Sequence, residues 1–208
     1  MFLSIKNQNL ESIQFSEPNK GEDEQLYCDV LNNKEPLYIQ TPKMKYNVLS
    51  NSVQLLFDSD NLSDFYSLIK NMESKMCEKL QHVSNTWFSQ QISKELIEKD
   101  LWKSCINIPT KLKDPLSITV KIPYTAEGEE DFEVYNTSKK KLGLSFLKKN
   151  ENSVEGTFLI VAKEMTINST RVDIEWELVQ VLVHTKKKKL KGFGIREEKN
   201  ECKVNLLN

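Results

Sequence analysis

The sequence predicts an α+β fold, a small antiparallel β-barrel that carries a long helical insertion. Three observations predict it. Short apolar segments in the first quarter end at proline or polar residues, one long stretch repeats apolar residues at helical spacing, and the second half alternates apolar and polar residues. At 208 residues the chain is long enough to bury one core, so we expect one main domain.

Residues 1–36 are predicted to form an N-terminal extended arm and loop. Their apolar positions are scattered, and the breakers Pro18 and Gly21 precede a polar run at 22–25. The main domain is predicted over 37–208. It begins with two short strands, at 37–39 and 53–57, joined through a turn at Pro42.

The helical insertion is predicted at about 63–105. Apolar residues recur three or four positions apart from Phe65 to Trp87, and Ser63 with Asp64 supplies an N-cap and an acidic first turn. A shorter helix is expected at 93–105, because Pro109 forbids its continuation. Phe65 and Trp87 are expected in the core, together with Trp176 from a later strand.

The second half predicts a series of strands. Residues 116–122 alternate strictly between apolar and polar, and further strands are expected at 132–135, 142–146, 156–162 and 172–184. In the last of these the alternation changes phase after Val179, which predicts a bulge or bend. Two strands, a helical insertion and several short strands are the order expected of an OB-like barrel, with a plain α+β sandwich as the alternative.

The composition is that of a soluble globular protein, with 38% apolar and 28% charged residues. No apolar run approaches the length of a membrane span, and the first residues lack the pattern of a secretion signal. Cys28, Cys77, Cys105 and Cys202 are too far apart for a zinc knuckle, so reduced structural thiols are expected in a cytosolic or nuclear protein.

The net charge is −1, but the charges are segregated along the chain. Acids crowd into 127–133, whereas lysine runs follow at 139–141, 148–149 and 186–191. This arrangement permits a basic face on a nearly neutral protein.

No catalytic motif is present in the sequence. The histidines His82 and His184 have no sequence neighbours suited to a metal pair or a nucleophile-base pair. No phosphate-binding loop or dinucleotide fingerprint occurs, and the calcium-like run at 58–64 lacks the required glycine and the distal acid. We therefore expect neither an enzyme nor a metal or other cofactor.

Binding of a single nucleic-acid strand requires cations for the phosphates and exposed aromatic rings on which bases stack. Lysines and tyrosines are interleaved at several places in the chain. The predicted nucleic-acid-binding residues are Tyr38, Lys43, Lys45, Tyr46, Lys121, Tyr124, Lys186, Lys187, Lys188 and Lys189. The lysine run at 186–191 has three interpretations: a solvated loop, a phosphate clamp or a nuclear import signal.

Five segments, at 13–18, 36–44, 65–88, 101–122 and 176–183, stand in an order that resembles a family of proteins of about 200 residues in nucleocytoplasmic large DNA viruses; the most specific element is Gln40-Thr41-Pro42-Lys43-Met44. Some members of that family are similar to phage single-stranded DNA-binding proteins with an OB-fold. The resemblance implies a non-catalytic single-stranded DNA-binding protein of viral DNA replication or recombination. Such phage proteins commonly end in an acidic tail, whereas this chain ends in a basic-to-neutral, aliphatic segment.

The implied partners are single-stranded DNA and replication proteins, and no membrane; self-association is left open. The implied location is the host cytoplasm at the viral factory, the nucleus or the virion. The chief alternative is a viral structural or scaffold protein that assembles through protein contacts, and the third is an enzyme without a recognisable motif.

Overall fold

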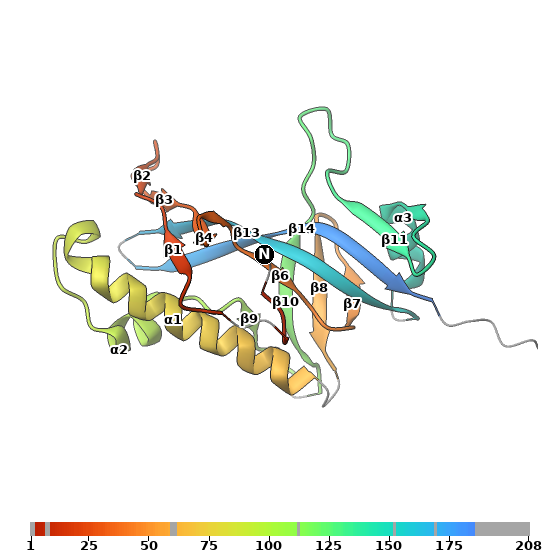
Figure 1. Cartoon of the computed structure of the whole chain (residues 1–208), viewed down its shortest axis with the longest axis horizontal. Helices are drawn as coiled ribbons and strands as arrows, with labels where there is room; N and C mark the ends of the chain where they lie inside the picture. Colours follow the sequence, from red (N-terminus) through yellow and green to blue (C-terminus); the bar gives the residue numbers. More distant parts are fainter. Residues whose placement is uncertain are drawn as a thin grey trace, which may run out of the picture.

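The computed structural model describes residues 3–6, 9–58, 62–111, 113–151, 153–168 and 170–185. They form a mixed α+β structure dominated by an 11-stranded sheet, with a separate 3-stranded sheet beside it (Figure 1). The strands of the large sheet are β2 (Asn19–Lys20), β3 (Leu26–Cys28), β6 (Tyr38–Gln40), β7 (Lys45–Val48), β8 (Ser52–Phe57), β9 (Ile106–Asn107), β10 (Leu116–Lys121), β11 (Glu133–Asn136), β12 (Lys141–Leu142), β13 (Glu155–Ile167) and β14 (Val172–His184).

The long hairpin of β13 and β14 is the centre of the sheet and crosses the molecule from end to end (Figure 1). Alternate residues of both strands are buried, as the sequence pattern requires for a sheet with one covered face. The bounds of β14 agree with the predicted strand at 172–184.

A bulge in β14 confirms the predicted change of phase. Leu159 is the partner of Gln180, whereas the next residue of β13, Ile160, is the partner of Leu178. Val179 is therefore left without a partner in the register, and the buried positions shift from even to odd numbers after it.

The strands on either side of the hairpin connect through one continuous segment. β6 pairs with β13, and Met44, which follows β6, forms an isolated β-bridge with Gly156 of β13. The chain then continues into β7, which pairs with β8. β8 pairs with β10, and β10 meets β14. The pairings of β10 and β11 with β14 are parallel, so the expectation of a wholly antiparallel arrangement is wrong; long connections, not tight hairpins, separate these strands from β14.

Helix α1 (Ser63–Trp87) confirms the predicted long helix and lies along the β13–β14 hairpin (Figure 1). Its buried side chains recur at helical spacing and include Phe65, and this ring stacks on Phe57 of β8 at 5.8 Å between centroids. The N-cap position is Leu62, with no side-chain hydrogen bond, so the predicted capping role of Ser63 is wrong: Ser63 is already the first helical residue.

The second helical segment is shorter than predicted. It consists of α2 (Lys94–Leu96), capped by the Ser93 side chain, and the π-helical turn η2 (Ile97–Leu101). It ends there because Trp102 is extended and bridges Val172, whose carbonyl accepts a hydrogen bond from the backbone N–H of Lys103 at 2.9 Å.

The strand predicted at 142–146 is mostly helix. Only Leu142 belongs to a strand, the short β12, and α3 (Leu144–Asn150) begins after Gly143. Leu144 and Leu147 are buried, and their separation of three residues matches a helical turn better than strand alternation.

The first 36 residues contribute strands to both sheets. The small sheet consists of β1 (Ile13–Phe15), β4 (Val30–Asn32) and β5 (Glu35–Pro36). In the large sheet, β3 pairs with the C-terminal end of β13, and β2 pairs with β3. Leu3 is buried and bridges Ile39 in parallel. The division into an arm over 1–36 and a domain over 37–208 stays a prediction.

The described cysteines are free. Burial raises the pKa of both Cys28 and Cys77 to about 12, and Cys105 is partly buried; Cys202 lies outside the described residues. Within the part of the chain that the structure describes, no helix is long and apolar enough to cross a membrane.

Candidate nucleic-acid interface

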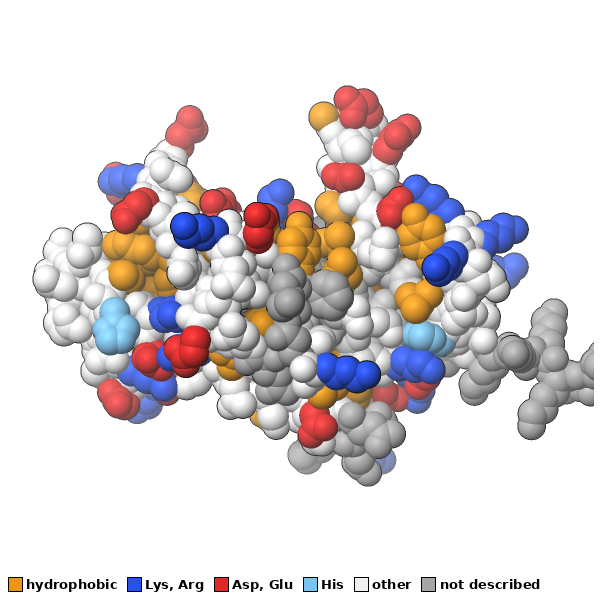
Figure 2. Space-filling model, viewed as in Figure 1, with side chains coloured by type: hydrophobic (Ala, Val, Ile, Leu, Met, Phe, Trp, Pro, Cys, Tyr) orange, Lys and Arg blue, Asp and Glu red, His pale blue; other side chains and the backbone are white. Residues whose placement is uncertain are grey.

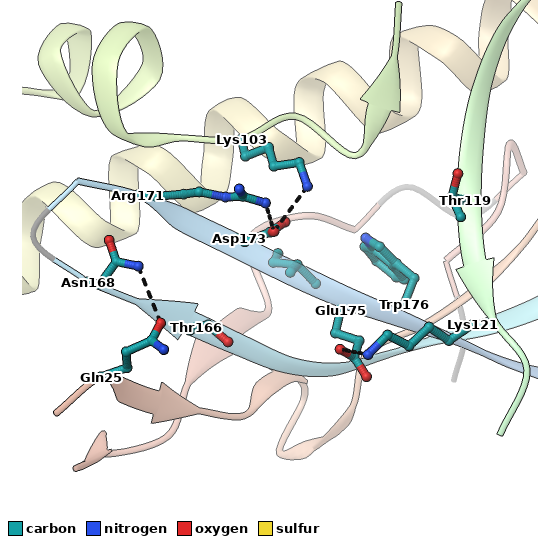
Figure 3. Close-up of a pocket in the computed structure, with 11 residues that line it drawn as sticks. Gln25, Lys103, Thr119, Lys121, Thr166, Asn168, Arg171, Asp173, Glu175 and Trp176 are labelled. Carbon is teal, nitrogen blue, oxygen red and sulfur yellow. Dashed lines mark hydrogen bonds and ion pairs between the residues drawn. The ribbon is translucent and has the colours of Figure 1, made fainter. Parts of the chain in front are cut away.

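A groove opens where β10 and β14 separate. Within the described chain, Lys121 and Glu177 are the only residues of these two strands that pair in the sheet register. Away from that point the strands diverge, and a cavity of about 410 Å³ lies between them (Figure 3). The groove is lined by Gln25, Lys103, Thr119, Lys121, Thr166, Asn168, Arg171, Asp173, Ile174, Glu175 and Trp176.

Both faces of β14 contribute to the groove. Asp173 and Glu175 are only partly buried, whereas Ile174 and Trp176 belong to the buried face of the strand. Trp176 is 3% exposed, which confirms the prediction that it is a core residue, and its indole N–H has no hydrogen-bond partner in the described structure. The groove thus has an apolar floor between polar walls.

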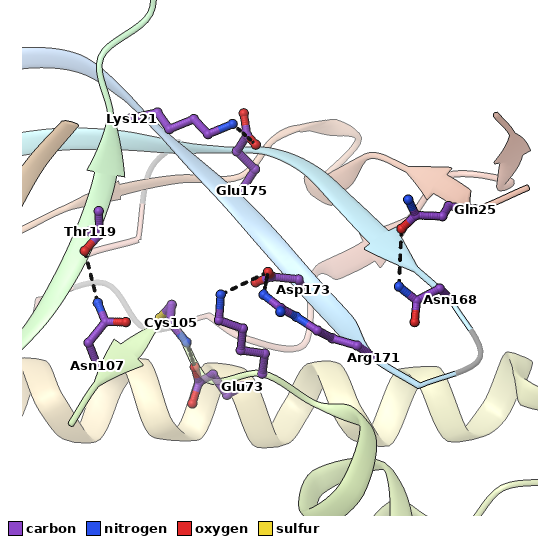
Figure 4. Close-up of polar contacts among 11 residues, drawn as sticks. Gln25, Glu73, Cys105, Asn107, Thr119, Lys121, Asn168, Arg171, Asp173 and Glu175 are labelled. Atoms are coloured by element: carbon purple, nitrogen blue, oxygen red, sulfur yellow. Dashed lines mark hydrogen bonds and ion pairs between the residues drawn. The ribbon is translucent and has the colours of Figure 1, made fainter. Parts of the chain in front are cut away.

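The cations of the groove are paired with carboxylates. Lys121 forms an ion pair with Glu175, Arg171 forms one with Asp173, and Lys103 Nζ lies 3.2 Å from Asp173 Oδ2 (Figures 3 and 4). The three cationic side chains remain about half exposed, and such surface pairs contribute only about 0–1 kcal/mol. A phosphate group can therefore replace the carboxylates at small cost, although it has to compete with them.

Tyr38 lies in the same cross-strand row as Lys121. Tyr38 of β6 is the partner of Val161 in β13, and Val161 is the partner of Glu177 in β14. Glu177 in turn is the partner of Lys121 in β10. None of the four is fully buried, whereas their chain neighbours Ile39, Ile160, Leu178 and Val120 are, so the row lies on the outer face of the sheet. At about 4.8 Å between strands, roughly 14 Å separates the backbones of Tyr38 and Lys121.

Tyr46 is not available for stacking, and the structure removes it from the candidate site. Its side chain is completely buried, packs edge-on against Phe158 at 5.5 Å, and its hydroxyl donates to the carbonyl of Leu147 at 3.4 Å. Burial raises the pKa of Tyr46 to about 12. Tyr46 points inward because it alternates with the exposed Lys45 along β7.

Lys43 and Lys45 are exposed on either side of the buried Met44, but they lie apart from the groove. Lys45 pairs with Asp58 at 2.5 Å. Lys43 lies near His184, whose pKa is lowered by burial and by that lysine.

Tyr124 is 43% exposed and bridges Glu130 at the base of the acidic loop between β10 and β11. The structure therefore brings Tyr38 and Lys121 into one row and leaves Tyr124, Lys43 and Lys45 elsewhere. Lys186, Lys187, Lys188 and Lys189 lie outside the described residues.

Two groove cations, Lys103 and Arg171, are absent from the predicted nucleic-acid-binding residues. Lys103 reaches the groove because the chain after η2 runs extended beside Val172. Arg171 reaches it because it directly precedes β14 at the turn of the β13–β14 hairpin. The only sequence signals were the neighbouring Trp102 and the position of Arg171 between two predicted strands. In the described chain, no cluster of histidine, cysteine, aspartate or glutamate has the arrangement of a metal site.

The chain matches no protein-family model and no curated protein sequence. Among solved structures it is similar to the C-terminally truncated single-stranded DNA-binding protein of bacteriophage Enc34, with a TM-score of 0.46 and 12% identity over 86% of this chain and 99% of that one. The complex of the Enc34 protein with single-stranded DNA gives a TM-score of 0.41 and 12% identity over 85% and 97% of the two chains. The gp2.5 single-stranded DNA-binding protein of bacteriophage T7 gives 0.40 and 7% over 83% and 98%.

Proposed function

We propose that this protein binds single-stranded DNA without catalysing a reaction, and that the groove between β10 and β14 holds the strand. The observation that carries the proposal is the placement of Tyr38 and Lys121 in one outer row beside a groove that also holds Lys103 and Arg171. Cations for phosphates next to an accessible aromatic ring are the combination that single-strand binding requires.

The strand order supports an OB-like barrel as the scaffold. If the continuous segment of β6 and β7 is the first strand, β8, β10, β13 and β14 are the second to fifth. In this numbering the first strand pairs with the second, the second with the third, the third with the fifth, the fifth with the fourth, and the fourth with the first. OB-folds bind oligonucleotides at their second and third strands and at the loop between the fourth and fifth. The groove has walls from β10 and from the turn that joins β13 to β14, which is the corresponding place.

The biological setting is proposed from the resemblance of the sequence to proteins of large DNA viruses. In that setting the protein coats single strands during viral DNA replication or recombination and works beside replication proteins, in the cytoplasmic viral factory or the nucleus. The domain over 37–208 supplies the cations and the aromatic ring that hold the strand, and the arm over 1–36 contributes Gln25 to the lining of the groove.

The test is a fluorescence-anisotropy titration with labelled single-stranded and duplex DNA of the same length. We expect the intact protein to prefer the single strand, and Lys103→Ala/Lys121→Ala/Arg171→Ala to weaken single-strand binding about tenfold or more at moderate salt. The matched control is Lys34→Ala/Lys99→Ala/Lys113→Ala, which removes as much charge from exposed residues that do not line the groove. Equal losses in both variants would show that net charge alone sets the affinity and that the groove does not hold the strand. No binding by the intact protein would support the viral structural or scaffold protein instead.

A further inference from the structure

The outer face of β14 changes character at the bulge. Before Val179 the outward positions are the carboxylates Asp173, Glu175 and Glu177. After it they are Gln180, Leu182 and His184, because the skipped residue exchanges the two faces of the strand. The acidic side of β14 thus stops where β11 begins to pair with it.

Beyond the bulge an apolar row lies on the outer face. Leu182 is the partner of Tyr135 in β11 and of Thr157 in β13, and Tyr135 is also the partner of Lys141 in β12. Leu182 is 36% exposed, and Tyr135 is partly exposed. A tyrosine ring beside an exposed leucine offers an apolar surface on which a base can lie.

Four lysines without carboxylate partners lie in the elements that follow β11 in the chain. Lys139 and Lys140 lie in the turn between β11 and β12, and Lys148 and Lys149 lie in the last turn of α3. All four are exposed, and none has an ion pair within the described chain. The groove cations Lys103, Lys121 and Arg171, by contrast, all have one.

Three nearby carboxylates have other partners than these four lysines. Glu133 pairs with Lys141 at 3.1 Å and accepts hydrogen bonds from the side chains of Tyr135 and Gln180. Glu151 Oε2 accepts a hydrogen bond from the backbone N–H of Val48 at 2.8 Å, and Glu130 Oε2 accepts one from that of Leu144 at 3.2 Å. None of these three carboxylates forms an ion pair with the four lysines, and Figure 2 shows basic and apolar side chains gathered over β11 and the end of β14.

The turn that carries two of these lysines has a defined conformation. Asn136 Oδ1 accepts hydrogen bonds from the backbone N–H groups of Ser138 and Lys140, both at 2.9 Å, and Lys139 has a positive φ of 60°. An ordered turn places the ammonium groups with a smaller loss of backbone entropy on binding than a flexible loop would.

We propose that Tyr135, Leu182, Lys139, Lys140, Lys148 and Lys149, here called the β11–α3 surface, form a second contact for the same single strand, where phosphates meet the lysines and a base lies on the apolar row. The inference rests on the proposed function of the groove. Glu175 of the groove and Leu182 of the second contact both lie in β14, and the seven residue steps between them span roughly 23 Å of strand. A strand lying along β14 reaches this surface only if it extends beyond the groove.

Oligonucleotide length separates the two contacts. We would titrate labelled oligo(dT) of about 4 and about 16 nucleotides, which bracket the site sizes of OB-folds. Lys139→Ala/Lys140→Ala/Lys148→Ala/Lys149→Ala should weaken binding of the long strand about tenfold and leave that of the short strand unchanged, whereas the groove variant should weaken both. Arginine at the same four positions should preserve long-strand affinity, and Lys20→Ala/Lys34→Ala/Lys99→Ala/Lys113→Ala is the control for net charge.

The possible outcomes separate the two proposals. If the intact protein binds neither oligonucleotide, the function proposed for the groove is wrong. If it binds both, and the β11–α3 variant binds the long strand like the parent, the function stands and the second contact is wrong. The same conclusion follows if sedimentation shows that the variant loses self-association while it keeps long-strand affinity, because the lysines would then bind a second copy of the chain.

Discussion

Lys121 of β10 and Glu175 of β14 form an ion pair across the mouth of the groove (Figure 4). The pair occurs where the two strands begin to separate, so the carboxylate holds the lysine above the apolar floor formed by Ile174 and Trp176. The same residue that positions the lysine also competes with a phosphate for it. If the groove holds single-stranded DNA as proposed, this ion pair lowers its affinity for the strand.

Removal of that competitor should tighten binding. Glu175→Gln keeps the size of the side chain but frees Lys121, so we expect the affinity for single-stranded DNA to rise severalfold at low salt. Glu22→Gln, at an exposed turn position outside the groove, makes the same change in net charge. Anisotropy titrations of the two variants should differ; an equal gain would show that only overall charge matters.

Tyr38 of β6 and Tyr46 of β7 should behave in opposite ways. Tyr38→Ala should weaken single-strand binding by about 1–3 kcal/mol, the contribution of one stacked base, and Tyr38→Phe should not. Tyr46→Phe should leave binding unchanged, because that ring is buried, and should lower the free energy of unfolding by about 1 kcal/mol through loss of its hydrogen bond to Leu147. Reduced DNA affinity in Tyr46→Phe would place that ring at the interface after all.

Two tryptophans that the sequence placed in the core should differ in their effect on stability. Trp176 is 3% exposed, so Trp176→Ala should cost about 3–5 kcal/mol. Trp87 is only partly buried, at the end of α1 with its ring 6.0 Å from that of Phe15, and Trp87→Ala should cost clearly less. Urea denaturation measures both values, and equal costs would contradict the difference in burial.

A buried carboxylate joins α1 to the segment before β9. Glu73 is 5% exposed, and its Oε1 accepts a hydrogen bond from the backbone N–H of Cys105 at 2.7 Å (Figure 4). Lys70 Nζ lies 3.0 Å from Oε2 of the same carboxylate. Glu73→Ala leaves that N–H unsatisfied and should lower the free energy of unfolding by about 1–3 kcal/mol. Chemical denaturation would detect the loss, and unchanged DNA affinity would confirm that Glu73 acts on structure alone.

Periodicity was a reliable guide where one face of an element is buried. The apolar spacing from Phe65 to Leu80 fits only a helix, and the alternation in β14 fits only a strand. Even the bulge at Val179 is visible in the sequence as a change of phase. The strand predicted at 142–146 was wrong because Leu142, Leu144 and Phe146 alternate like the residues of a strand, whereas Leu144 and Leu147 are the buried residues of helix α3. Short apolar runs fit either period.

The candidate site was less predictable, because it depends on contacts between distant segments. Lys121 and Tyr38 were identified by their neighbours in sequence, and their common row exists only through β13 and β14. Tyr46 was misassigned because its lysine neighbours are exposed while its own side chain points inward. Arg171 and Lys103 meet at Asp173 only in the folded chain.

The salt dependence of single-strand binding tests the central claim most directly. If Lys103, Lys121 and Arg171 contact phosphates, the slope of log K against log salt for the parent should be steep, and the triple alanine variant should be shallower by about 2, at about 0.7 for each lost contact with a single strand. The Lys34/Lys99/Lys113 control should keep the parental slope. A slope that is the same in the groove variant and the parent would contradict the claim that the groove holds the DNA.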